Sequence, residues 1–234
     1  MFVPIHDGAP LRHIKRPHVA WTLIAVNVAI WAAGALGWLG DMQRVDTALG
    51  VIPAVVTGEA RLAPDLSLVP TWMTFVTSMF LHGGLFHLAA NMLFLWVFGD
   101  NVEDAMGARR FALFYLLCGL GGSAAYVLTA PHAESPMIGA SGAIAGVVAA
   151  YLMFYPRMRV FGLAFNVVPF RIPAWVALGL WIGAQIVSAL FLPRGEVSFW
   201  AHVGGILTGA ALTPFLRRPG HPLGWPRRPP GDPV

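Results

Sequence analysis

Residues 139–155 read GASGAIAGVVAAYLMFY, a run of 17 residues that contains no charged side chain. An α-helix needs about 20 apolar residues to cross a bilayer, and fewer where other helices enclose it. The run therefore predicts a membrane-spanning helix that begins beside a serine, Ser141.

Five further apolar stretches flank this run. They cover about residues 19–38, 86–98, 111–129, 172–192 and 199–216. Of the 234 residues 57% are apolar and only 11% are charged, whereas a soluble domain has about 25% charged residues. This composition excludes a soluble enzyme, a disordered chain and a secreted disulfide-stapled domain. The predicted fold is an all-α membrane protein, a bundle of six transmembrane helices with a long first outer loop.

We expect three segments along the chain. A cytoplasmic N-terminal segment covers residues 1–18, the six-helix domain covers 19–217, and a proline-rich cytoplasmic tail covers 218–234. No small-residue cleavage site follows a short apolar region near the N-terminus, so the first span is predicted to be retained. Within the long loop, residues 72–81 are apolar but too few to span, and we expect them to lie in the membrane interface or to re-enter it partly.

The basic residues predict the orientation. Twelve of the 15 Lys and Arg residues fall on the side of the two termini, and the three on the other side are Arg44, Arg61 and Arg194. Because cytoplasmic loops carry the excess of basic residues, both termini are predicted to be cytoplasmic. The same distribution explains the net charge of +4 without a nucleic-acid partner.

Four polar side chains fall at one depth in this orientation. His87 and Asn91 lie four residues apart on one face of the second span, Ser141 opens the fourth, and His202 lies in the first turn of the sixth. Polar groups are costly in lipid, so their convergence in the outer third of the membrane indicates a functional site.

Ser141 and His202 have the chemistry of a nucleophile and its general base. No Asp or Glu lies within the predicted spans, so the sequence predicts a Ser–His dyad rather than a triad with a third acidic member. The helix N-terminus at Ser141 and the side chains of His87 and Asn91 can supply donors to an oxyanion. With two or three imidazoles in reach and no Cys or carboxylate, neither a metal nor another cofactor is expected.

Two pairs of glycines predict a close helix contact. Gly142 and Gly146 are four residues apart in the fourth span, as are Gly205 and Gly209 in the sixth. Small residues at this spacing let helix backbones approach in lipid. His202 shares a helix face with Gly205 and Gly209, so the same contact would carry its imidazole toward Ser141.

Each of these features also has a purely structural interpretation. A serine in a membrane helix commonly bonds to its own backbone, and an intramembrane histidine or asparagine can bridge helices. Glycine pairs alone indicate only packing. His82 could be no more than a loop or interface histidine, and the apolar run around Cys118 indicates a small core residue.

Three segments resemble the rhomboid family of intramembrane serine proteases. Residues 78–107, SMFLHGGLFHLAANMLFLWVFGDNVEDAMG, resemble the family's HxxxxHxxxN segment with its following Gly, Glu and Gly. GASGAIAG at 139–146 resembles the GxSG motif, and AHVGGILTGAAL at 201–212 resembles the segment of the catalytic histidine. The residues that fall on the first motif are His82, His87, Asn91, Gly99, Glu103 and Gly107.

The resemblance implies an endopeptidase with Ser141 as nucleophile and His202 as general base. It implies an oxyanion hole made by His87, Asn91 and the Ser141 backbone N–H, with His82 supporting the loop. Its supporting motif residues would be Gly139, Gly142, Glu103, Gly205 and Gly209. Many bacterial members have Trp-Arg in the first outer loop, whereas here Trp72 is followed by Met73, so the anchoring role of that arginine does not carry over.

The resemblance also implies a class of substrate. We expect contact with membrane lipid and single-pass transmembrane proteins cut near the outer face; the oligomeric state is not predicted. The small size and short tails favour a bacterial cytoplasmic membrane over that of an organelle. Water must reach Ser141, which predicts a polar cavity above the second, fourth and sixth spans. The second and fifth spans, with the loop at 72–81, are the expected substrate entry.

Two alternatives belong to other classes. A catalytically silent relative would bind membrane helices without cutting them, but inactive relatives commonly lack one member of the dyad, and both Ser141 and His202 are present. A small transporter would show an internal repeat and a polar site at the midplane. The sequence shows no convincing repeat, and its polar cluster lies off the midplane.

Overall fold

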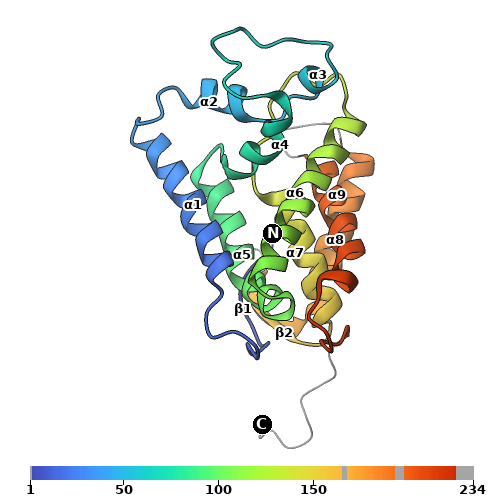
Figure 1. The fold of residues 1–234 in the computed structure, drawn as a ribbon. Coiled ribbons are helices and arrows are strands. Elements are labelled where there is room, and N and C mark those ends of the chain that lie inside the picture. The colour runs from blue at the N-terminus through green and yellow to red at the C-terminus, as the bar shows by residue number, and fades with distance from the viewer. Residues whose placement is uncertain (1, 165–167, 193–197, 225–234) are drawn as a thin grey trace, which may run out of the picture.

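The computed structural model describes residues 2–164, 168–192 and 198–224. Within these ranges the chain forms a helical bundle in which five helices are long and apolar enough to cross a membrane (Figure 1). They are α1 (His18–Ala35), α5 (Leu85–Met106), α6 (Ala108–Thr129), α8 (Ala174–Phe191) and α9 (Phe199–Leu216). A sixth, shorter apolar helix is α7 (Ser141–Phe154). Each of the six predicted spans therefore corresponds to a helix, although only five have the length of a full crossing.

The short helix α7 lies at the centre of the bundle. Its residues 142–151 are all buried, and it packs against α5, α6 and α9. Its 14 residues rise about 21 Å at 1.5 Å each, whereas the hydrocarbon core is about 30 Å thick. If its far end lies at the membrane boundary, its first residue, Ser141, lies roughly 9 Å beneath the opposite boundary.

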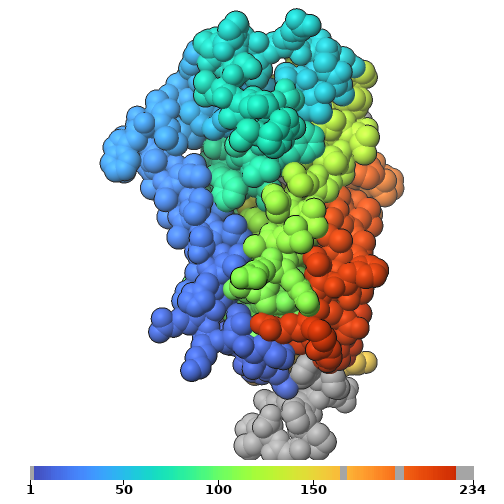
Figure 2. Space-filling model, viewed as in Figure 1, coloured from blue at the N-terminus to red at the C-terminus, as the bar shows by residue number. Residues whose placement is uncertain are grey.

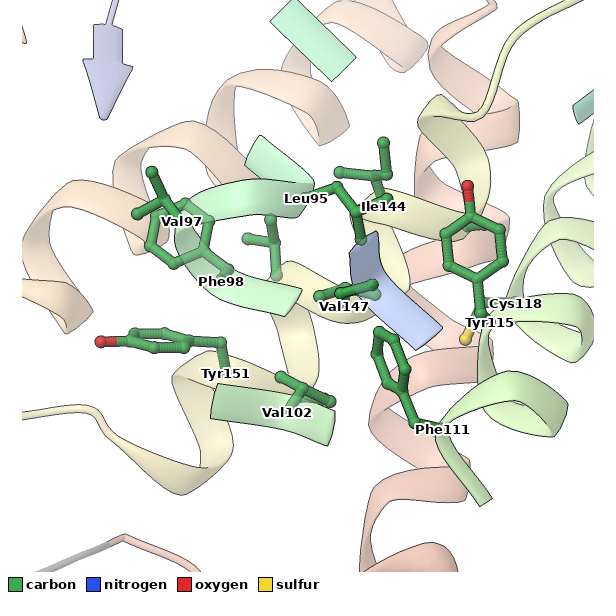
Figure 3. Close-up of a cluster of buried hydrophobic side chains, with 14 of the residues drawn as sticks. Leu95, Val97, Phe98, Val102, Phe111, Tyr115, Cys118, Ile144, Val147 and Tyr151 are labelled. Atoms are coloured by element: carbon green, nitrogen blue, oxygen red, sulfur yellow. The ribbon is translucent and has the colours of Figure 1, made fainter. Parts of the chain in front are cut away.

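The core around α7 is aromatic and branched. Figure 3 shows Phe98 of α5 beside Tyr151 of α7, with ring centroids 4.8 Å apart, and Phe111 of α6 near Val147 of α7. All four residues are fully buried. The one cysteine, Cys118, is a buried free thiol in the same cluster. Large side chains thus surround the part of α7 that follows its first turns, whereas glycines make the contact between α7 and α9.

The long loop between α1 and α5 forms a cap of short helices at one end of the bundle (Figures 1 and 2). It contains α2 (Met42–Leu49), α3 (Pro53–Val56), η1 (Thr71–Met73), α4 (Thr74–Thr77) and η2 (Ser78–Phe80). An antiparallel bridge joins Val51 to Met137, with N···O distances of 3.0 and 2.8 Å. The cap is therefore tied to the segment that leads into α7.

A three-stranded antiparallel sheet lies at the other end of the bundle, and the sequence did not predict it (Figure 1). The strands are β1 (Phe2–Asp7), β2 (Arg159–Ala164) and β3 (Val168–Pro173), in the order β1-β2-β3. Val3 pairs with Leu163, a partner far along the chain, and Phe161 pairs with Arg171. Strands of six residues carry little periodic signal, and the pairing partner of β1 is not local, so hydropathy did not reveal them.

Helix α5 continues eight residues beyond the predicted end of the second span at Phe98. Two acidic residues in this extension, Glu103 and Asp104, are buried, and their carboxylates accept hydrogen bonds from backbone N–H groups of residues 12–20. Glu103 accepts from Val19 N at 3.1 Å and Ala20 N at 2.9 Å, which caps the first turn of α1. Asp104 accepts from the backbone N–H groups of Arg12, His13 and Ile14. The prediction that no carboxylate lies on a spanning helix is therefore wrong for α5, at the end remote from Ser141.

The expected C-terminal tail is anchored over its first residues. Arg218 N donates to the Ala105 carbonyl at 2.8 Å, and Gly224 N donates to the Met153 carbonyl at 2.7 Å. The described part of the predicted proline-rich tail thus packs against the ends of α5 and α7. The rest of the predicted tail, 225–234, and Arg194 of the predicted outer side lie outside the described residues.

Candidate active site

Ser141 and His202 are in hydrogen-bond contact. Ser141 is the first residue of α7, and His202 lies in the first turn of α9. The His202 Nε2 atom is 2.9 Å from the Ser141 Oγ atom, although the residues are 61 positions apart. A neutral imidazole at this distance can accept the serine proton.

Glycines bring α7 and α9 together at this point. A Cβ built on Gly205 would overlap the carbonyl group of Gly142, so the two helices meet backbone to backbone. Because Gly205 follows His202 by less than one turn, this contact sets the imidazole opposite the start of α7. A larger residue at position 205 would hold the helices apart and lengthen the distance between Ser141 and His202.

Gly139 shapes the turn before the serine. Its φ of +122° is strained for any residue with a side chain, and a Cβ there would stand 2.8 Å from the His87 ring. Its N–H donates to the Ser78 carbonyl at 2.9 Å. Glycine at this position therefore lets the chain pass close to His87 just before Ser141.

Asn91 offers a spare donor beside the serine. It lies one turn after His87 on α5, is 7% exposed, and lines the same cavity as Ser141. Among the described residues its Nδ2 atom has no hydrogen-bond partner. A buried, unsatisfied N–H group is costly, so a negatively charged oxygen formed in the cavity would be a favourable partner for it.

His82 packs behind His87 rather than facing the cavity. Its ring is 4% exposed and lies edge to face against the His87 ring, with centroids 5.0 Å apart. Burial lowers the pKa of His82 to about 4, so this ring is neutral at pH 7. His82 thus packs against the His87 ring and is not among the residues that line the cavity.

A cavity of about 1700 Å³ connects these residues. It is lined by parts of α5 to α9 and by residues 133–139, and it includes His87, Asn91, Ser141 and His202. It covers the second, fourth and sixth spans, as expected, and extends further to α8. Its wall is more apolar than predicted, because Phe86, Phe94, Leu180, Trp181 and Phe199 contribute to it.

Helix α8 brings two residues to the site that the sequence analysis missed. Gln185 Oε1 lies 2.7 Å from His202 Nδ1, and the Trp181 ring stacks on the imidazole with centroids 6.3 Å apart. An amide side chain inside the apolar stretch 172–192 was a signal for Gln185. Glu103, by contrast, lies near the other end of α5, where it binds the start of α1.

Comparison with known proteins agrees with these features. A family model described as the Rhomboid domain matches residues 69–219. Over 81 residues the chain is 44% identical to the rhomboid protease GluP of Bacillus subtilis, a match that covers 35% of this chain and 15% of that protein. It is 35% identical over 137 residues to RHOMBOID-like protein 5 of Arabidopsis thaliana, covering 58% of this chain and 41% of the relative.

A human relative belongs to the same set. The mitochondrial presenilin-associated rhomboid-like protein of Homo sapiens is 35% identical over 156 residues, covering 65% of this chain and 39% of that protein. The chain thus spans about two fifths of the length of the plant and human relatives.

Proposed function

The chain belongs to the rhomboid family, and we propose that it is a serine endopeptidase that cuts single-pass membrane proteins near the outer face of the membrane. The observation that carries the proposal is the 2.9 Å contact between Ser141 Oγ and His202 Nε2. The contact lies in a cavity among helices that are long and apolar enough to cross a membrane. Named relatives include a protease, the Bacillus subtilis GluP.

In the proposed reaction, the Ser141 oxygen attacks the carbonyl carbon of the substrate peptide bond while His202 Nε2 takes the hydroxyl proton. The carbonyl oxygen becomes an oxyanion, which the Asn91 amide, the His87 ring and the Ser141 backbone N–H can stabilise. The imidazolium then gives its proton to the leaving amine, and the peptide bond breaks to leave an acyl-serine. A water molecule, deprotonated by His202, hydrolyses that ester and restores the serine.

The proposed substrate is a transmembrane helix that unwinds locally. Peptide bonds in a helix are hydrogen-bonded and shielded, so a carbonyl must leave its helix to reach Ser141. The cavity lies between α5 and α8, and α8 buries only Ala174, Ala177 and Leu178. This sparse packing supports entry from the lipid between the two helices.

We further propose that both termini are cytoplasmic and that the membrane is a bacterial cytoplasmic membrane. The distribution of basic residues supports the orientation. A membrane-impermeant thiol reagent on intact cells tests it, because the native Cys118 is buried. A cysteine in place of the exposed loop residue Ser67 should be labelled, and one in place of exposed Arg157 should not; the reverse pattern would contradict the orientation.

The alternative is a silent relative that binds membrane helices without cutting them. A fluorophosphonate probe and a model single-pass substrate separate the two. We expect the wild-type protein to be labelled and to cut, and Ser141→Ala to lose labelling and at least about 10³-fold in rate. His202→Ala should lose a similar factor in rate.

Ser135→Ala is the matched control, since Ser135 lines the same cavity but is exposed and, among the described residues, is not a hydrogen-bond partner of His202. It should keep both activities. Labelling that survives Ser141→Ala, or a wild-type protein that binds the substrate without labelling or cleavage, would contradict the protease.

A further inference from the structure

Both ring nitrogens of His202 face a polar partner. Nε2 lies 2.9 Å from Ser141 Oγ, and Nδ1 lies 2.7 Å from Gln185 Oε1. A neutral imidazole carries one proton, on either nitrogen, and only the nitrogen without it can act as a base. The partner of Nδ1 therefore determines whether Nε2 is free to accept the proton of Ser141.

The carbonyl oxygen of an amide accepts hydrogen bonds and does not donate them. With Oε1 toward Nδ1, the proton of the neutral ring is held on Nδ1 and the lone pair is left on Nε2, facing the serine. This is the tautomer that a general base needs. An acidic residue performs the same task in serine hydrolases that have a triad.

The position of Gln185 follows from the face of α8 that meets the site. Trp181 and Gln185 are four residues apart and share one helix face. The Trp181 ring stacks on the imidazole at 6.3 Å with 30° between the planes. Phe199 approaches the same imidazole edge to face, with centroids 6.2 Å apart. Two aromatic rings thus restrict the plane of the imidazole, and Gln185 fixes its rotation within that plane.

An amide suits this place better than a carboxylate would. The site lies among apolar helices, where a buried charge costs several kcal/mol unless it is well paired. A neutral amide that is partly buried and hydrogen-bonded carries a much smaller penalty. Gln185 can therefore orient the base without placing a charge in the membrane.

We propose that Gln185 is the positioning residue of the dyad, holding the proton of neutral His202 on Nδ1 so that Nε2 accepts from Ser141. This inference rests on the proposed function and adds a third member, supplied by α8, to its machinery. Because α8 packs mainly against α9, the position of α8 relative to α9 determines whether Gln185 reaches His202 Nδ1. Movement of α8 away from α9 would release the imidazole.

The test compares Gln185→Leu and Gln185→Glu with the wild-type full-length protein in detergent. Leucine keeps the approximate volume but removes the acceptor, whereas glutamate keeps an acceptor oxygen in either protonation state. We expect Gln185→Leu to lower kcat and the rate of fluorophosphonate labelling on the order of 10-fold, with a smaller effect on KM. Gln185→Glu should restore both rates to within about 3-fold of wild type.

The pH profile gives a readout that mere packing would not change. A carboxylate beside the imidazole favours its charged form, which cannot act as a base. The acid limb of the rate–pH profile should therefore move to higher pH in Gln185→Glu. Ser188→Ala, on the same helix one turn further, is the control and should leave both rates and the profile unchanged.

Three results would overturn the inference. They are wild-type rates and profile in Gln185→Leu, a Gln185→Glu variant as slow as Gln185→Leu, or an acid limb that does not move in Gln185→Glu. Should Gln185→Leu fail to fold, the last two measurements on Gln185→Glu still decide it. A wild-type protein that the probe does not label at Ser141 would overturn the proposed function itself, which is a different result.

Discussion

Gly209 of α9 and Gly146 of α7 meet with no side chain between them, since a Cβ on Gly209 would stand 2.6 Å from the Gly146 Cα. The contact repeats, one turn further into the bundle, the approach of Gly205 to Gly142. Together the two contacts make a seam along which α7 and α9 lie as close as backbones allow. The site lies at the end of this seam where α7 and α9 begin, so the distance from His202 to Ser141 is set by glycines that take no part in the chemistry.

A methyl group in the seam should therefore impair the site from a distance. Gly209→Ala places a Cβ against backbone atoms, which cannot move aside as a flexible side chain could. We expect a loss of about 1–3 kcal/mol of stability and a clear fall in the rate of substrate cleavage. Thermal unfolding in detergent and a cleavage assay measure the two effects.

Gly183→Ala on α8 is the control for this substitution, because a Cβ there meets nothing within 4 Å. Alanine is the better helix former by about 1 kcal/mol, so this variant should melt at the same or a slightly higher temperature. Equal melting temperatures and rates for Gly209→Ala and the wild type would show that the seam does not set the geometry.

The carboxylate of Glu103 should stabilise the fold without affecting the chemistry. It accepts from two N–H groups in the first turn of α1, at 3.1 and 2.9 Å, and Glu103 is 1% exposed. Glu103→Ala leaves both donors without this partner, so we expect a loss of about 1–3 kcal/mol. The labelling rate of each folded molecule should stay at the wild-type value. Asp65→Ala, which breaks an exposed ion pair with Arg44, should leave the melting temperature unchanged.

Hydropathy and spacing predicted the spans and the polar residues at one end, because membrane helices and buried polar groups have strong local signals. The predicted family is confirmed by the match to the Rhomboid domain. The sheet was not predicted, since β1 pairs with a strand more than 150 residues away. The end of α5 was misplaced because the partners of its buried acids lie in the N-terminal segment.

Gln185 shows a different limit of sequence reasoning. A helix of mostly apolar residues can face its neighbours in many rotations, and α8 has little amphipathic pattern to select one. The residue that reaches His202 depends on how α8 packs against α9, which only the three-dimensional structure shows. Ser141 and His202 were predicted more readily because they lie in the first turns of their helices and have glycines close by in the sequence.

Asp7 should make the stability of the protein fall as the pH rises. Asp7 is 5% exposed, and its carboxyl group accepts from Tyr151 Oη at 2.6 Å and Asn101 Nδ2 at 3.0 Å. Burial raises the pKa of Asp7 from 3.8 to about 7. Between these values the folded state holds a proton that the unfolded chain has lost. The contribution of this group to the free energy of unfolding is therefore fully present below pH 3.8. It falls by about 1.4 kcal/mol per pH unit as the pH rises from there to about 7.

Asp7→Asn isolates this effect. Burial lowers the pKa values of His82 and His221 to about 4, which makes stability rise with pH, but both histidines are present in the two proteins. We expect the variant to gain in melting temperature relative to the wild type as the pH is raised from 5 to 8. If the difference in melting temperature between the two proteins stays constant from pH 5 to 8, the Asp7 carboxyl group titrates normally and the prediction is wrong.

The contact between Phe94 of α5 and Trp181 of α8 should control the entry of substrate. The ring centroids are 5.5 Å apart, and both residues line the cavity at the side where α5 and α8 face each other. An aromatic pair of this kind contributes about 1 kcal/mol, so its loss should ease separation of the two helices. Trp181 also stacks on His202, which makes Phe94→Ala the cleaner test. We expect this variant to cut a transmembrane substrate about 5-fold faster. Its rate of fluorophosphonate labelling should be unchanged, because a small soluble probe reaches Ser141 without passing between the helices.

Phe215→Ala is the control for this substitution. Phe215 lies on α9 and is 81% exposed, so its replacement should change neither rate. If Phe94→Ala instead slows labelling and cleavage equally, the ring supports the geometry of the dyad and does not close an entrance.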